Sequence, residues 1–168
     1  RGELVTNINV NAKGKNFNDF IGNILIDSLH YQEGDKSFVT QNFHGFVERN
    51  KTKDSISVKS EIIDLEVNGL IDYTVVSQNI VEQIAKVFPA INFAERKPIK
   101  EDKTYFNYDV TFKDVNEILD VFMPDIKVAN NAKLFGKYIG TKNYIGVDLL
   151  ADYITYKNMK FLDISGMQ

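Results

Sequence analysis

The sequence predicts a mainly β fold (β-rich α+β): an elongated, curved antiparallel sheet or trough of repeated short strands, with two short helices. Several segments alternate apolar and polar residues with a period of two, as strands with one dry face do. Short turns rich in glycine, asparagine and aspartate separate these segments. Two segments, residues 76–88 and 114–122, space their apolar residues as a helix does. Strands therefore dominate the expected fold.

The first half of the chain begins with its clearest strand. Within residues 4–12, Ile8 and Val10 alternate with asparagines, so one face is apolar and the other polar. Gly14 begins a break in this pattern, and residues 16–20 are expected to form a tight turn or a single helical turn. Further strands are expected at residues 21–31, 37–47 and 55–71, with a polar hairpin loop at residues 50–54.

The expected strand at residues 55–71 changes phase midway. Val58 and Ile62 share one parity, whereas Ile63 and Leu65 share the other. A β-bulge or sharp bend near Ile62 and Ile63 would bring both sets onto one face. We therefore expect a single bent strand here.

The two helices are expected to end at prolines. The first, residues 76–88, presents Val76 and Ile80 on one face and stops before Pro89. The second, residues 114–122, starts at Asp114 as a capping residue and stops before Pro124. The charged stretch between the first helix and the next strand reads as a loop.

The second half returns to short strands. Phe106, Tyr108, Val110 and Phe112 alternate with polar residues directly before the second helix. After it, short strands are expected at residues 134–139, 143–151, 153–156 and 159–164. We expect one β-rich unit with a first strand block at 1–72, a helix and loop at 73–102, and a second strand block at 103–168.

Composition excludes several classes of protein. A chain of 168 residues with 43% hydrophobic residues can bury a sizeable core, yet no apolar run approaches the roughly 20 residues that span a bilayer. A net charge of -3 with scattered lysines argues against nucleic acid as a partner. The absence of cysteine excludes disulfides and thiolate metal sites. Because the sequence starts at Arg1 without methionine or targeting segment, we expect an internal fragment of a longer protein.

No catalytic or metal site is expected from the motifs. His30 and His44 are the only histidines, and they lack metal-ligand spacing. No GxSxG turn presents a serine nucleophile, and no pair of carboxylates is placed to converge. We therefore expect neither an enzyme nor a bound cofactor or metal.

One modification motif stands out. The triplet Asp54-Ser55-Ile56 resembles the short O-glycosylation signal of envelope proteins in Bacteroidetes, and Ser55 is expected to be accessible because a loop carries it. The hypothesis is a glycan on Ser55. An intact mass of the natively expressed protein tests it.

The aromatic residues leave two alternatives open. The face bearing Phe106, Tyr108 and Phe112 is either core covered by the helix at residues 76–88 or an open groove for acyl chains. An elongated sheet with only short helices has little to cover a second apolar face. The residues expected to line such a groove are Phe106, Tyr108, Val110, Phe112, Ile145, Val147 and Leu149.

Three segments carry a family resemblance. They are VNGLIDYTVVSQNIVEQIAKVFPA, FNYDVTFKDVNEILDVFMPDIKVANNAKLFGKY and INVNAKGKNFNDFIGNILIDSLHY. The first two resemble the corresponding segments of TamB-type translocation and assembly proteins of Bacteroidetes. The third is similar to the repeating strand units of the same TamB and AsmA-like superfamily.

The resemblance implies a long periplasmic β structure curled into a trough, polar outside and apolar inside. It implies an inner-membrane anchor outside this sequence, an outer-membrane β-barrel assembly partner and contact with neighbouring repeats of the same chain. It also implies roles in outer-membrane protein assembly and in moving phospholipid between membranes, without catalytic residues. The rival hypothesis is a protein-interaction module whose exposed edge strands pair with a client by β-augmentation, without lipid binding.

Overall fold

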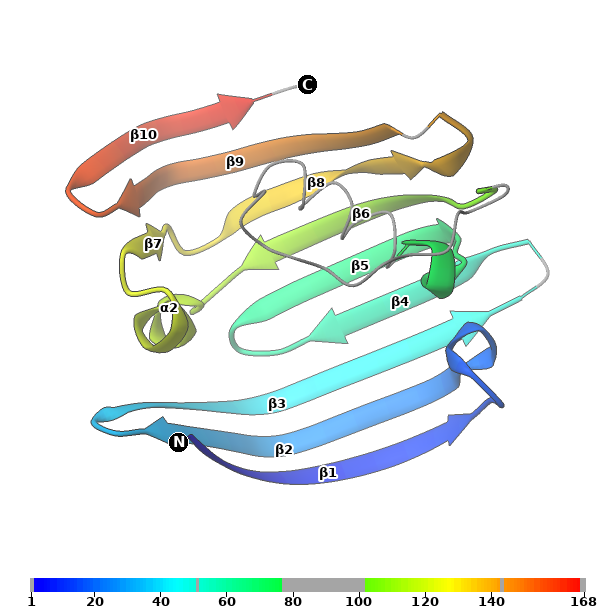
Figure 1. Ribbon diagram of the computed structural model, residues 1–168, viewed down its shortest axis with the longest axis horizontal. Coiled ribbons are helices and arrows are strands. Elements are labelled where there is room, and N and C mark those ends of the chain that lie inside the picture. Colours follow the sequence, from blue (N-terminus) through cyan, green and yellow to red (C-terminus); the bar gives the residue numbers. More distant parts are fainter. Residues whose placement is uncertain (1, 51, 77–101, 143, 167–168) are drawn as a thin grey trace, which may run out of the picture.

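The computed structural model shows one open, curved antiparallel sheet, which confirms the predicted fold class. It describes residues 2–50, 52–76, 102–142 and 144–166. Within these residues the sheet has ten strands: nine follow the order β1-β2-β3-β4-β5-β6-β8-β9-β10, and the tenth, β7, pairs with β9 (Figure 1). The strands are β1 (Glu3–Lys13), β2 (Ile21–Glu33), β3 (Lys36–Arg49), β4 (Asp54–Lys59), β5 (Ile63–Leu70), β6 (Tyr105–Phe112), β7 (Ile126–Val128), β8 (Ala132–Ile139), β9 (Tyr144–Tyr156) and β10 (Met159–Gly166). The helical elements are η1 (Phe17–Asp19), α2 (Asn116–Phe122) and η2 (Gly140–Lys142), and residues 73–76 are also helical.

The two expected strand blocks form one continuous sheet. Strand β5 of the first block pairs with β6 of the second along its whole length, from Ile63 opposite Phe112 to Leu70 opposite Tyr105. In Figure 1 the edge strands β1 and β10 lie at opposite sides of this sheet. The two strand blocks, although separated in sequence, are therefore neighbours in one sheet.

The prediction of a single bent strand at residues 55–71 is wrong, because the chain reverses there as the β4–β5 hairpin. The Ser60 hydroxyl accepts hydrogen bonds from the backbone N–H groups of Ile62 (3.3 Å) and Ile63 (3.0 Å), and it donates to the Ile63 carbonyl (2.8 Å). The Ser60 side chain thus provides hydrogen-bond partners for backbone groups of the tight turn. The phase change marked a reversal that leaves Val58 opposite Leu65 on one face.

The helix predicted at residues 114–122 is confirmed as α2, two residues shorter at its start. The expected cap is wrong: Val115 occupies the N-cap position, and no side chain caps the helix. Asn116 instead bonds across the loop, donating from Nδ2 to the Val128 carbonyl and accepting from the Val128 N–H. The helix ends at Phe122, before Pro124, as the sequence predicts.

Helix α2 packs at the far end of the long strands β2 and β3. The Phe122 ring lies 5.1 Å from that of Tyr31 and 6.0 Å from that of Phe38, and Tyr31 stacks on Phe38 at 5.7 Å. Strands β4 and β5 are shorter than β2 and β3, and α2 lies beside the turn between them (Figure 1). The helix therefore closes this end of the sheet with aromatic contacts.

The helix predicted at residues 76–88 falls almost wholly outside the described residues. Residues 73–76 are helical, and Asp72 caps them: its Oδ1 accepts hydrogen bonds from the N–H groups of Thr74 and Val75. Asn18 of η1 holds the same turn, because its Oδ1 accepts from the Tyr73 N–H at 2.9 Å. Helical structure thus begins earlier than the apolar spacing predicts.

Candidate binding face

Two ladders of apolar residues cross eight strands of the sheet without interruption. They share one face, because directly paired residues of neighbouring antiparallel strands point the same way. One ladder is Val10, Ile24, Gly45, Val58, Leu65, Val110, Leu134 and Leu149. The other is Ala12, Gly22, Val47, Ile56, Val67, Tyr108, Gly136 and Val147. We call the side of the sheet that carries them the apolar face.

The structure brings the seven predicted groove residues onto the apolar face. Strand β8 lies between β6 and β9, so residues of β6 and β9 that pair with the same β8 residue form one row across the three strands. Six of the seven residues lie in three such rows. Phe112 pairs with Ile63 and Ala132 beyond the last of these rows. The rows are Phe106–Tyr138–Ile145, Tyr108–Gly136–Val147 and Val110–Leu134–Leu149.

One end of the apolar face is core. Phe106 is 9% exposed and Tyr138 3% exposed, and their rings stack with centroids 5.3 Å apart. Ile71 completes this cluster, and Tyr73 and Val76 from the helical turn pack against it. The Tyr138 hydroxyl donates a hydrogen bond to Asp102. We call this cluster the closed end.

A buried polar pair supports the closed end. An oxygen of the Asp54 carboxylate accepts a hydrogen bond from the Ile71 N–H at 2.8 Å, and Arg49 donates to the Ile71 carbonyl at 3.2 Å. The guanidinium of Arg49 also lies 4.4 Å from the centroid of the Tyr73 ring and 3.8 Å from Asp54. Sequence reasoning missed this pair, although opposite charges flanking the 50–53 loop were a signal for it.

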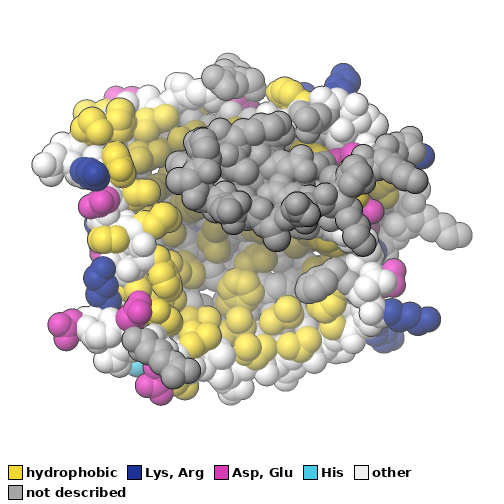
Figure 2. Space-filling view, in the orientation of Figure 1, with side chains coloured by type: hydrophobic (Ala, Val, Ile, Leu, Met, Phe, Trp, Pro, Cys, Tyr) yellow, Lys and Arg dark blue, Asp and Glu magenta, His cyan; other side chains and the backbone are white. Residues whose placement is uncertain are grey.

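Away from the closed end and from the end covered by α2, much of the apolar face is open. Ile145 and Val147 on β9 are 42% and 41% exposed, and Ile8 and Val10 on β1 are 51% and 56% exposed. Figure 2 shows hydrophobic side chains gathered in a hollow, with charged side chains around its rim. One part of the apolar face is therefore core, and another part is exposed.

The Tyr108 hydroxyl is the one polar side-chain group in the two ladders, and it is hydrogen-bonded. The Tyr108 hydroxyl donates a hydrogen bond of 2.8 Å to the Gly146 carbonyl, with the ring lying over Gly136. Burial raises the pKa of the Tyr108 hydroxyl, and the charge of Asp148 adds to the effect. The hydroxyl therefore stays protonated and donating at neutral pH, and it adds no charge to the apolar face.

The opposite side of the sheet, the polar face, carries charged networks instead. Lys113 Nζ lies 2.7 Å from Asp64 and donates to the Ser60 carbonyl at 2.8 Å, while Lys59 lies 3.6 Å from Asp64. Burial alone would raise the pKa of Asp64, but the hydrogen bond from Lys113 and the charge of Lys59 hold it below its usual value. This network fastens the β4–β5 turn to the residue that follows β6.

Ser55 lies within strand β4 and not in a loop, contrary to the sequence-based expectation. Its side chain is half-buried on the polar face, and its hydroxyl donates to Asn68 Oδ1 at 3.2 Å. A glycan on Ser55 would displace this hydrogen bond. The expected loop position of the glycosylation site is therefore wrong, because Ser55 lies in a strand.

The candidate chemical groups do not converge. His30 and His44 are exposed on different strands, β2 and β3. Among the described residues, no three histidine or carboxylate side chains gather as a metal site would require. The helices described here are all too short or too polar to cross a bilayer.

Fold and face together define a class of protein: an open amphipathic antiparallel sheet with a hollowed apolar face. Comparison with family models, curated proteins and solved structures found no match for this chain.

Proposed function

We propose that this chain is a non-catalytic segment of a periplasmic, TamB-like scaffold whose apolar face holds lipid acyl chains. The observation that carries the proposal is the pair of uninterrupted apolar ladders, which cross eight strands without a charged side chain. A soluble sheet normally covers such a face or uses it.

The dimensions of the ladders suit an acyl chain. Strands lie about 4.8 Å apart, so a ladder across eight strands is roughly 34 Å long. One leaflet of a bilayer core is about 15 Å thick, so a ladder exceeds the depth of a single acyl chain. Each methylene removed from water contributes about 0.8 kcal/mol, and ten partly covered methylenes contribute several kcal/mol. Because this attraction has no direction, the affinity should be broad across lipids.

The wider role in this proposal comes from the TamB resemblance. The segment would support outer-membrane protein translocation and assembly, anchored to the inner membrane by another part of the protein. An outer-membrane β-barrel assembly component would be its partner, and neighbouring repeats would extend the sheet. The two unpaired sheet edges, β1 and β10, are where such repeats would join.

A matched pair of variants tests the lipid proposal. Val147→Asp places a charge on the apolar face, and Leu150→Asp places it on the polar face of the same strand. Their native side chains are 41% and 43% exposed, so both variants should fold. Crosslinking to a phospholipid with a photoreactive acyl chain should fall several-fold for Val147→Asp only. Equal crosslinking by both variants would reject lipid binding on the apolar face.

A second candidate function is protein interaction through the edge strands, without lipid. The edges favour it, since Leu4 and Val5 on β1 are 56% and 58% exposed, and Phe161 and Leu162 on β10 are 51% and 63% exposed. Unpaired backbone groups beside apolar side chains form a template for an added strand.

The double variant Val5→Lys/Phe161→Lys separates the two functions, because lysine on an edge strand opposes strand addition and both residues lie on the polar face. Sedimentation velocity over a concentration series should show weaker self-association if the edges pair. Lipid crosslinking should stay unchanged. Loss of crosslinking together with unchanged association would refute pairing through the edges.

A further inference from the structure

The polar face carries an apolar row beside the closed end. Leu70, Tyr105, Ile139 and Tyr144 pair across β5, β6, β8 and β9. Each lies next in sequence or register to the Phe106–Tyr138 row, so their side chains point to the other side of the sheet. Tyr105 is 53% exposed, and Leu70 and Tyr144 are each 38% exposed. We call these four residues the outer row.

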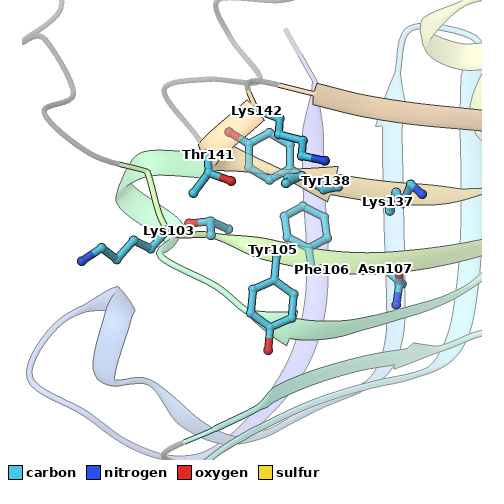
Figure 3. A pocket seen from close by; sticks show the side chains of 10 residues that line it. Lys103, Tyr105, Phe106, Asn107, Lys137, Tyr138, Thr141 and Lys142 are labelled. Atoms are coloured by element: carbon cyan, nitrogen blue, oxygen red, sulfur yellow. The ribbon is translucent and has the colours of Figure 1, made fainter.

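Lysines surround the outer row. Lys103, Lys137 and Lys142 line an open depression of about 430 Å³ together with Tyr105 and Ile139. In Figure 3 these three lysines lie around the rings of Tyr105, Phe106 and Tyr138. Since the rings of Phe106 and Tyr138 are almost fully buried, the exposed lining of the depression consists of Tyr105, Ile139 and the lysines, together with Asn107 and Thr141.

The polar face also carries acidic residues. The acidic row Glu66–Asp109–Asp148 crosses the same strands four residues further along, about 13 Å from the outer row. Asp102 lies beside the depression, and its carboxylate accepts hydrogen bonds from the Thr104 N–H and the Tyr138 hydroxyl. Asp72 and Asp102 line a neighbouring depression together with Leu70 and Lys103. Three lysines thus adjoin the outer row, whereas Lys59, Lys113 and Lys133 lie further along the strands near the acidic residues.

We propose that the outer row and its lysines dock on the surface of an anionic lipid bilayer. Tyrosine suits this boundary because its ring is apolar and its hydroxyl stays in water, and Tyr105 is the most exposed member of the row. Lysines beside it gain from the negative surface potential, each by roughly fivefold in affinity. The lysines stand around an exposed ring and do not converge on one point, which favours a surface over a small soluble anion.

This docking is independent of acyl binding in the proposed function, because the two use opposite faces of the sheet. It places the closed end at the membrane.

The test uses a matched pair of lysines on one strand. Lys137 and Lys133 are both exposed on the polar face of β8, four residues apart, and only Lys137 adjoins the outer row. Sedimentation with phosphatidylcholine vesicles containing 30% phosphatidylglycerol should show about fivefold or greater weakening for Lys137→Glu. Lys133→Glu should bind like the unaltered chain. Tyr105→Ser should weaken binding as well, and circular dichroism should show that all three variants keep their strands.

Other outcomes would overturn the proposal. Equal weakening by Lys133→Glu would show a response to net charge alone, and unchanged binding by Lys137→Glu would remove the outer row from the interface. Full competition by soluble glycerol phosphate would identify a small-anion site in place of a membrane surface. Val147→Asp, which targets acyl binding, should leave the dependence on phosphatidylglycerol intact, so the two proposals can fail separately.

Discussion

The closed end and the open part of the apolar face have the same sequence pattern and different surroundings. Phe106 and Val147 lie in adjacent register rows on one face, yet their exposed fractions are 9% and 41%. The difference comes from what packs above them: Ile71, Tyr73 and Val76 cover Phe106. Alternation of apolar and polar residues therefore determines which face a side chain joins, and the chain that crosses that face determines whether it becomes core.

The largest difference in stability between the two regions should come from removing a ring at the closed end. Tyr138→Ala should lower the free energy of unfolding by about 4 kcal/mol, because it removes a ring stacked on Phe106 and leaves a cavity. The contrasting change in the open part of the apolar face, Val147→Ala, shortens a side chain that is 41% exposed and should cost less than about 1 kcal/mol. Urea unfolding of both variants measures the difference. Similar losses would mean that the two regions are equally packed.

A somewhat smaller effect should follow from adding volume at the closed end. A side chain at Gly69 would collide with the backbone of Tyr105 and Phe106, so Gly69→Val should cost roughly 2–3 kcal/mol. Gly166→Val on β10 is the control, since no atom lies within 4 Å of its new Cβ. Thermal unfolding followed by circular dichroism checks both. A neutral Gly69→Val would show that the closed end has room to spare.

The comparison extends to the polar face through the pH dependence of stability. The pKa of Asp64 is held below its usual value, so its contribution is present above the unfolded value of about 3.9 and is lost as the pH falls through the folded value. Asp64→Asn should therefore cost roughly 1 kcal/mol at pH 7 and almost nothing at pH 2. Urea unfolding at both pH values tests this sign. A cost that persists at pH 2 would assign the effect to packing.

The smallest expected effect concerns Ser55. Its hydroxyl makes one hydrogen bond to Asn68, so Ser55→Ala should lower the free energy of unfolding by about 0.5 kcal/mol. If Ser55 carried a glycan, the mass of the natively expressed protein would exceed the mass calculated from its sequence, and Ser55→Ala would remove the excess. A mass equal to that of the sequence rejects the modification.

Sequence reasoning succeeded where one local rule decides the structure. The seven predicted groove residues alternate with polar residues on β6 and β9, so those of each strand point to one side of the sheet. The pairing of both strands with β8 puts the two sets on the same face. Pro124 likewise determined where α2 ends. Errors arose where a side chain took an unforeseen partner: Ser60 completed a hairpin turn, and Asn116 bonded Val128 in place of a helix cap at Asp114.

The sequence by itself determined that this protein is a sheet with one apolar and one polar side, because a period of two leaves a strand no alternative. Only the tertiary structure decided that the apolar face is sealed at Phe106 and Tyr138 and open at Ile145 and Val147. It also decided that Leu70, Tyr105, Ile139 and Tyr144 meet on the polar side. The physical reason is that coverage and cross-strand neighbours depend on contacts between residues far apart in the chain, which local periodicity does not encode.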